Sequence, residues 1–158
     1  MNNLYFSPAI FLFALVLLWP GRLAPLRLQQ LAFALWLCGG LILLSYGLLR
    51  LSQGLHLGQL GWGGAFGVLA GAVLLGLAKG QLIFKKSCIR NLARLHGLQS
   101  PQRAVQVYPL RSWLMIGLML LLASSLNWFE VPLVWRGGVN ITVGIALIIS
   151  SLGYRKAY

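Results

Sequence analysis

Residues 62–78 read WGGAFGVLAGAVLLGLA and contain no charged side chain. The hydrocarbon core of a bilayer is about 30 Å thick, and a helix of about 17 to 20 apolar residues can cross it. Lipid offers the backbone no hydrogen-bonding partner, so a single spanning segment of this kind has to be helical. We therefore predict that residues 62–78 form a transmembrane helix.

Other apolar runs lie on both sides of this one. Three of them have a similar length and no charge, and we predict that they also span the membrane: residues 31–49, 113–129 and 139–153. A further run, residues 4–19, lies between a helix start at Ser7-Pro8 and a stop at Pro20-Gly21. It lacks the basic start and the small-residue cleavage site of a signal peptide, so we expect a retained, rather short span.

These runs predict an all-α integral membrane protein that forms a single domain over residues 1–158. The bundle contains five transmembrane helices, or four if the first run does not span. The composition agrees, because 59% of the residues are hydrophobic and only 9% are charged, against roughly 25% charged residues in an ordinary soluble domain.

The basic residues lie almost entirely on one side of the predicted bundle. The sequence has 13 Lys and Arg but a single acidic residue, Glu130. With five spans, all the basic residues except Arg50 and Arg136 share one side. Cytoplasmic loops are enriched in Lys and Arg, so we predict a cytoplasmic C-terminus and a cytoplasmic loop over residues 79–112.

The same charge distribution bears on location and partners. We expect a bacterial inner membrane, or an equivalent energy-transducing membrane, with anionic lipids as neighbours of the basic side. A strongly basic chain could also suggest a nucleic-acid partner. The charges lie between apolar runs and not on a soluble surface, so we expect none.

Small residues form a stripe along the run that was quoted first. Gly63, Gly67 and Gly71 are spaced four residues apart, and Ala72, Gly76 and Gly80 repeat the spacing on a neighbouring face. In lipid, small residues at this interval allow two helix backbones to approach closely. We expect these glycines to pack against another helix, of the same chain in the first instance or of a second chain.

The cytoplasmic loop contains an amphipathic segment, Leu82–Leu95. Drawn as a helix, it gathers basic residues on one face: Lys86, Arg90 and Arg94, with Lys85 beside them. The opposite face is apolar: Phe84, Cys88, Leu92 and Leu95. We expect a surface helix that ends at Gly97 and lies on the cytoplasmic headgroups with its apolar face in the lipid. The basic face either only anchors the loop or docks an acidic partner or an anionic lipid.

Groups suited to catalysis or metal binding are scarce. No ionisable residue lies at mid-depth in a predicted span, which argues against an ion-coupled carrier. Glu130 lies near the outer end of the fourth span, where we expect a salt bridge to Arg136 or Arg50. His56 and His96 lie on opposite sides of the membrane, so they cannot share a metal ion or a haem. We predict no catalytic residue and no metal ligand, and the sequence assigns no cofactor.

The pattern R-N-x-x-R from Arg90 to Arg94 is one of several features in the last half of the chain that occur together. The others are Pro101, Tyr108-Pro109, and the C-terminal Ala146–Ser151 followed by Tyr154. In these features the chain resembles a group of small uncharacterised bacterial multi-span membrane proteins. Residues 103–107 depart from that group's aromatic-rich approach to the next span. The resemblance implies a bacterial multi-span protein and no particular chemistry.

Three functional hypotheses follow from these observations. The first is a non-catalytic accessory, assembly or scaffolding subunit of a larger bacterial inner-membrane complex, docking by helix packing and by its basic cytoplasmic face. The second is a small oligomeric channel or carrier, because the ends of the third and fifth runs form a weak internal repeat. The third is a lipid-handling membrane enzyme that holds a headgroup on its arginines, although no nucleophile or base completes such a site.

Overall fold

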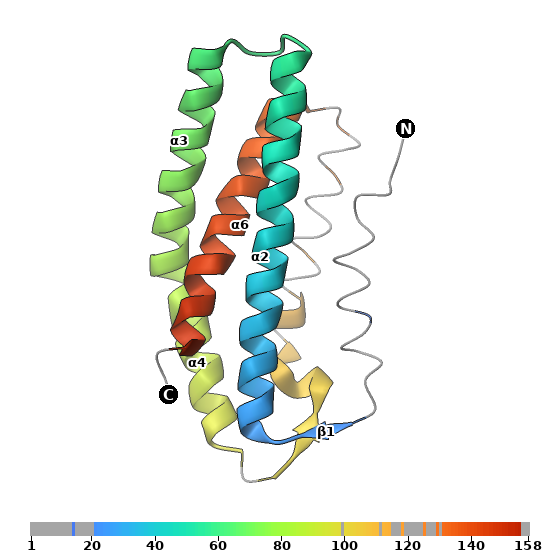
Figure 1. Ribbon diagram of the computed structural model, residues 1–158. Helices are drawn as coiled ribbons and strands as arrows, with labels where there is room; N and C mark the ends of the chain where they lie inside the picture. The colour runs from blue at the N-terminus through green and yellow to red at the C-terminus, as the bar shows by residue number, and fades with distance from the viewer. Residues whose placement is uncertain are drawn as a thin grey trace.

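The chain is mostly helical in its computed structural model (Figure 1). The structure describes residues 21–98, 100–110, 112–114 and 131–155, together with Ala14, Leu118, Ser125 and Phe129. Among these residues, three helices are long and apolar enough to cross a membrane: Pro25–His56, Trp62–His96 and Leu133–Tyr154. They agree with the all-α membrane protein predicted from the sequence. The predicted spans at 4–19 and 113–129 fall outside the described residues except at isolated positions.

Helix α2 (Pro25–His56) extends beyond the predicted run 31–49 at both ends. Pro25 lies in its first turn, where the N–H that proline lacks would have no partner within the helix. The chain leaves the helix through Gly58, whose φ of 65° is in the left-handed region that glycine adopts without strain. It then turns back into α3 (Trp62–Lys79), so α2 and α3 run antiparallel (Figure 1).

Helix α3 coincides with the predicted run 62–78 and continues past its end. A π-helical segment, η2 (Gly80–Phe84), joins it directly to α4 (Lys85–His96). The predicted amphipathic segment is therefore helical and is followed by Gly97 at its C-cap. It prolongs α3 and is not a separate helix beside the bundle.

Helix α6 (Leu133–Arg155) packs against both α2 and α3, whereas α2 and α3 hardly touch each other. The predicted run 139–153 lies within it. Figure 1 shows that α6 runs in the same direction as α3 and opposite to α2. The contact between α2 and α6 is the most extensive in the described part of the chain.

Glycines bring α2 and α6 together. Gly40 and Gly47 lie seven residues apart on α2, and Gly137 and Gly144 have the same spacing on α6. A Cβ atom on Gly40 would lie 2.9 Å from the carbonyl oxygen of Gly144, and one on Gly47 would lie 2.9 Å from that of Gly137. At these positions the backbone of each helix fills the space that a side chain on the facing helix would need. Seven-residue spacing is the repeat of a left-handed coiled coil; the prediction considered only the four-residue spacing in residues 62–78 and missed this contact.

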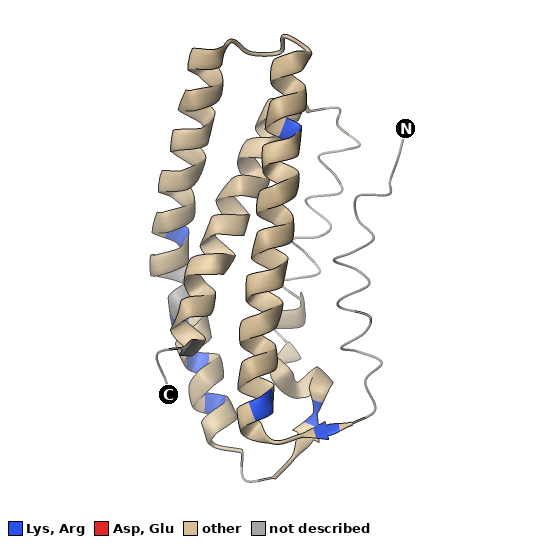
Figure 2. Cartoon of the chain, in the orientation of Figure 1, with Lys and Arg blue, Asp and Glu red and all other residues tan. Residues whose placement is uncertain are grey.

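One end of the bundle carries most of the charge, and we call it the basic end. Helix α2 begins there, and α4 and α6 end there (Figure 1). A short antiparallel ladder pairs β1 (Arg22–Leu23) with β2 (Gln102–Arg103) at this end, and a 3-10 helix, η3 (Ala104–Val107), follows. Figure 2 shows most of the described Lys and Arg gathered at this end, and none of the described residues is acidic.

Candidate functional site

At the basic end, Asn91 of α4 joins three parts of the chain. Its side-chain amide donates hydrogen bonds to the carbonyl oxygen of Val107 and to the hydroxyl of Tyr154, each at 3.0 Å. Its side-chain oxygen accepts from the Arg94 guanidinium, 3.2 Å from Nε and 3.1 Å from Nη2. Asn91 is 5% exposed, so these partners replace the water that its amide has lost.

Arg94 belongs to this network and is not a free surface cation. Its Nη2 also donates to the carbonyl oxygens of Gln106 at 2.6 Å and Val107 at 3.0 Å. The guanidinium fork thereby holds the last turn of η3 against α4. The sequence placed Arg94 on a docking face with Lys86 and Arg90, whereas its donors are engaged within the chain.

Gln29 of α2 completes the connection to α6. This side chain is 2% exposed, and its amide nitrogen donates to the carbonyl oxygen of Tyr154 at 2.9 Å. The last carbonyl groups of a helix have no partner within that helix, so Gln29 satisfies the end of α6 from a neighbouring one. Its oxygen lies 3.1 Å from Nε2 of His96, which connects α4 to the same residue.

An aromatic cluster packs beside these hydrogen bonds. Trp36 of α2 meets Phe84 edge-on with ring centroids 5.6 Å apart, and lies 6.5 and 6.3 Å from the rings of Tyr108 and Tyr154. The Tyr108 hydroxyl donates to the carbonyl oxygen of Ala32 at 3.0 Å. Burial raises the pKa of Tyr108 well above its ordinary value, and its neighbours Tyr154 and Cys88 act in the same direction. Tyr108 therefore stays neutral and keeps its donor.

The apolar face of α4 is covered by protein. Cys88 and Leu95 are fully buried and belong to one hydrophobic cluster with Leu28, Val107 and Tyr154. The expectation that this face lies in the lipid is therefore wrong for Cys88 and Leu95. The physical reason is that α4 continues the axis of α3 and so brings the face against the ends of α2 and α6.

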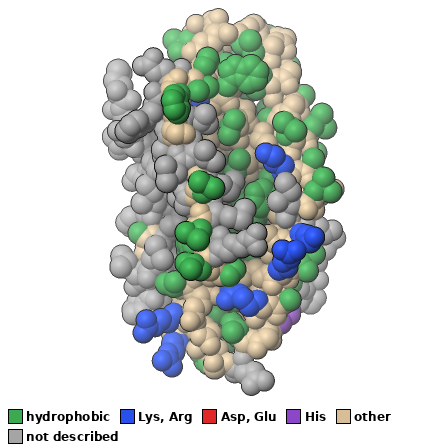
Figure 3. All heavy atoms as spheres, turned by 180° about the vertical axis from the view of Figure 1, so that it is seen from behind, with side chains coloured by type: hydrophobic (Ala, Val, Ile, Leu, Met, Phe, Trp, Pro, Cys, Tyr) green, Lys and Arg blue, Asp and Glu red, His purple; other side chains and the backbone are tan. Residues whose placement is uncertain are grey.

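The basic face of α4 divides into two kinds of residue. Lys86 and Arg90 are exposed, while Arg94 is partly buried. The side chain of Lys85, the fourth predicted docking residue, lies outside what the structure describes. Figure 3 shows Lys and Arg side chains mostly over the lower half of the rear face, with hydrophobic side chains scattered among the described residues.

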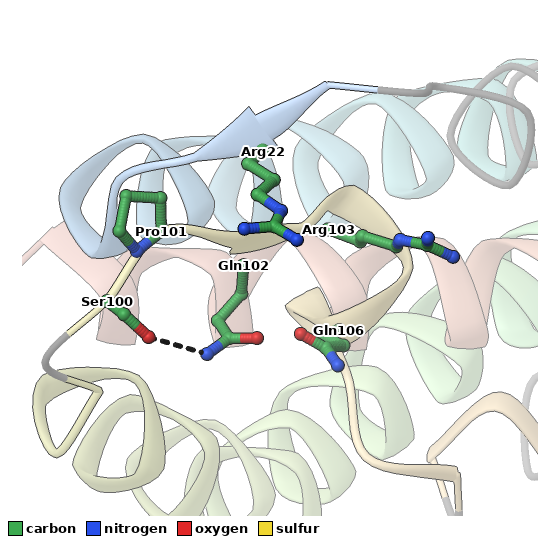
Figure 4. A pocket seen from close by; sticks show the side chains of 6 residues that line it. All are labelled: Arg22, Ser100, Pro101, Gln102, Arg103 and Gln106. Atoms are coloured by element: carbon green, nitrogen blue, oxygen red, sulfur yellow. Dashed lines mark hydrogen bonds between the residues drawn. The ribbon is translucent and has the colours of Figure 1, made fainter.

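A second group of basic residues, which the prediction used only to orient the chain, meets at the β1–β2 ladder. Arg22 and Arg103 are paired Cα partners there. With Gln102 of β2, Gln106 of η3 and the loop residues Ser100 and Pro101, they line a shallow pocket of about 250 Å³ (Figure 4). The Gln102 amide donates to the Ser100 hydroxyl oxygen at 3.1 Å. No sequence signal could have paired two arginines from segments so far apart along the chain.

The predicted glycine stripe is split between two environments. A Cβ atom on Gly76 would lie 2.8 Å from the carbonyl oxygen of Thr142, so this glycine packs against α6 as expected. For Gly63, Gly67 and Gly71, no described neighbour outside the helix's own backbone comes within 4 Å of such an atom. For these three glycines the contact with another helix, of the same chain or of a second one, stays a prediction.

The remaining predicted groups form no site in the described part of the chain. Glu130 lies outside the described residues, so its salt bridge to Arg136 stays a prediction. Arg136 is in the first turn of α6 and Arg50 is near the end of α2. Within the described residues, no three His, Cys, Asp or Glu side chains are grouped to hold a metal ion.

The open face of α3 and the basic end are the features of the described residues that could meet a partner. Comparisons of the chain with protein families, with curated proteins and with solved structures gave no match.

Proposed function

We propose that this protein is a non-catalytic accessory subunit of a larger membrane complex, and that a transmembrane helix of a partner subunit packs on the open face of α3. The supporting observation is the stripe of Gly63, Gly67 and Gly71 without a described neighbour. The partner is a membrane protein with a small-residue face of its own, because two helices approach closely only where both lack large side chains.

The open stripe is the proposed partner contact because the other face of α3 is already packed within the chain. The face with Ala72 and Gly76 is buried against α6, so the packing of this chain uses it. A glycine inside a helix costs about 1 kcal/mol relative to alanine, and close packing of another backbone offsets that cost. For the open stripe, the described residues provide no such contact, and a partner helix would.

Large apolar side chains near the stripe do not by themselves show whether lipid or a partner protein covers this face. Trp62, Phe66 and Leu74 are 74%, 66% and 66% exposed. Lipid covers side chains of this kind as well as protein does, so their exposure alone does not indicate a partner. The glycine stripe is different, because the absence of side chains there allows a second helix backbone to approach closely.

We further propose that the basic end faces the cytoplasm of a bacterial inner membrane. The gathering of Lys and Arg at that end supports this orientation (Figure 2), since cytoplasmic segments next to spans carry the excess of basic residues. Reporter fusions at residues 58 and 98 should then report opposite sides of the membrane.

The direct experiment is purification of the full chain from native membranes in mild detergent, followed by mass spectrometry of the proteins that accompany it. Gly67→Leu should remove the partner, because the larger side chain would occupy the space of the partner helix. Gly39→Leu is the matched control, since Gly39 of α2 also has open space among the described residues. It should leave the partner bound.

Two results would count against this function. If the chain purifies alone as a homo-oligomer, the accessory role is wrong, and measurements of flux in liposomes become the next step. If a partner is present but Gly67→Leu and Gly39→Leu retain it equally, the partner does not pack on the open face of α3.

A further inference from the structure

The β1–β2 ladder brings two like charges together at the surface. Arg22 and Arg103 are directly opposite in an antiparallel pair, so their side chains leave the same face from Cβ atoms roughly 5 Å apart. Both residues are exposed. Like charges in this position repel each other and destabilise the strand pairing. A bound anion that neutralises the two guanidinium groups would therefore stabilise the ladder.

The described residues include no Asp or Glu, so none of them supplies a side-chain carboxylate to this pair. An anion from outside the chain would supply the missing countercharge.

The surroundings of the two arginines match a phosphate group. A guanidinium presents a planar fork of donors that binds phosphate oxygens in pairs. The pocket adds side-chain amides from Gln102 and Gln106. It also adds the Ser100 hydroxyl, which accepts from Gln102 and so keeps its own proton available to a ligand. In Figure 4 the Arg22 side chain extends over the pocket from β1, while the Arg103 side chain leaves β2 and points away from Ser100 and Gln102.

We propose that this pocket, the Arg22–Arg103 pocket, binds a phosphate group, either in the headgroup of an anionic phospholipid or as free phosphate. A lipid is the source that the fold favours. Leu26, in the first turn of α2 and four residues from Arg22, is 55% exposed, so an apolar surface for acyl chains begins next to the pocket. This site is independent of the proposed contact of α3 with a partner.

The test uses the purified full chain in a neutral detergent, titrated with phosphatidylglycerol and followed by native mass spectrometry. A parallel titration uses inorganic phosphate alone. The double variant Arg22→Gln with Arg103→Gln should bind phosphatidylglycerol at least about tenfold more weakly, because both guanidinium forks are lost. The double variant Lys86→Gln with Arg90→Gln removes the same charge from exposed positions on α4 and should bind like the wild type.

The two titrations distinguish a lipid headgroup from free phosphate as the source of the bound phosphate group. Phosphatidylglycerol binding that only the Arg22/Arg103 variant loses supports the pocket and identifies a lipid; inorganic phosphate binding with the same dependence supports the pocket and identifies free phosphate. Equal loss in both double variants, or loss in neither, overturns the proposal. If the Gln double variant does not fold, as judged by circular dichroism, Arg22→Lys with Arg103→Lys replaces it. That variant keeps the charge, and its binding should fall because the fork is gone; undiminished binding would overturn the proposal.

Discussion

Gly47 and Gly137 face each other where α2 crosses α6. A Cβ atom on Gly47 would lie 2.9 Å from the carbonyl oxygen of Gly137, and one on Gly137 would lie 2.8 Å from the carbonyl oxygen of Gly47. The contact is reciprocal, and Gly40 and Gly144 repeat it one heptad along. Since backbone atoms are among those that obstruct a Cβ at these positions, the helices have to separate to admit even a methyl group.

The adjacent glycines of α2 offer a direct test of this contact. Gly40→Ala should lower the free energy of unfolding by about 1 to 3 kcal/mol, because overpacking outweighs the helix propensity that alanine adds. Gly39→Ala should be neutral or stabilising by up to about 1 kcal/mol, since no described residue obstructs its Cβ. Thermal unfolding in detergent, followed by circular dichroism, measures both. Equal effects of the two substitutions would mean that α2 and α6 do not pack in this register.

A second pair of substitutions distinguishes the two faces of α3. Gly76→Ala should destabilise the protein by about 1 to 3 kcal/mol, because its new methyl group would meet the Thr142 carbonyl oxygen at 2.8 Å. Gly71→Ala has open space and should leave the purified chain as stable as the wild type. Thermal unfolding of the chain alone gives the comparison, and a marked loss in Gly71→Ala would show that the stripe is packed within the chain.

Removal of the Asn91 amide should weaken the basic end. Asn91→Ala leaves the Val107 carbonyl and the Tyr154 hydroxyl without this donor, and it frees two donors of Arg94. Unsatisfied buried groups cost about 1 to 3 kcal/mol. Arg90→Ala, at an exposed position one residue away, should change stability by no more than about 0.5 kcal/mol. Hydrogen exchange would locate the loss in α4 and η3, and uniform protection in both variants would contradict the network.

The two cysteines should differ in reactivity. Cys88 is fully buried, with its sulfur 3.0 Å from where a Cβ on Gly153 would lie, while Cys38 is exposed. A buried thiol is inert towards alkylation. N-ethylmaleimide should therefore modify Cys88 only after denaturation, as read by intact-mass spectrometry with Cys38→Ser as background. Rapid modification of Cys88 in the folded protein would mean that α4 is not seated on α6.

The membrane class and the three long apolar helices among the described residues could be predicted from the sequence alone. The length of an apolar run and the absence of charge in it are local properties of the sequence. The helix predicted from them over residues 62–78 differs from α3 (Trp62–Lys79) by one residue. Amphipathic periodicity likewise predicted the helix of α4 and its end at Gly97. The ends of α2 were less accurate, because helical structure extends past the apolar run into Arg27 and Arg50.

Only the tertiary structure decided which faces of those helices are used. Gly67 and Gly76 are identical residues on one helix, and the position of α6 alone leaves the first open and buries the second. Gln29 and Tyr154 are 125 residues apart, and Arg22 meets Arg103 across the ladder. A periodic pattern reports how one segment folds, whereas such pairings depend on how several helices pack together, and that information is not local to any of them.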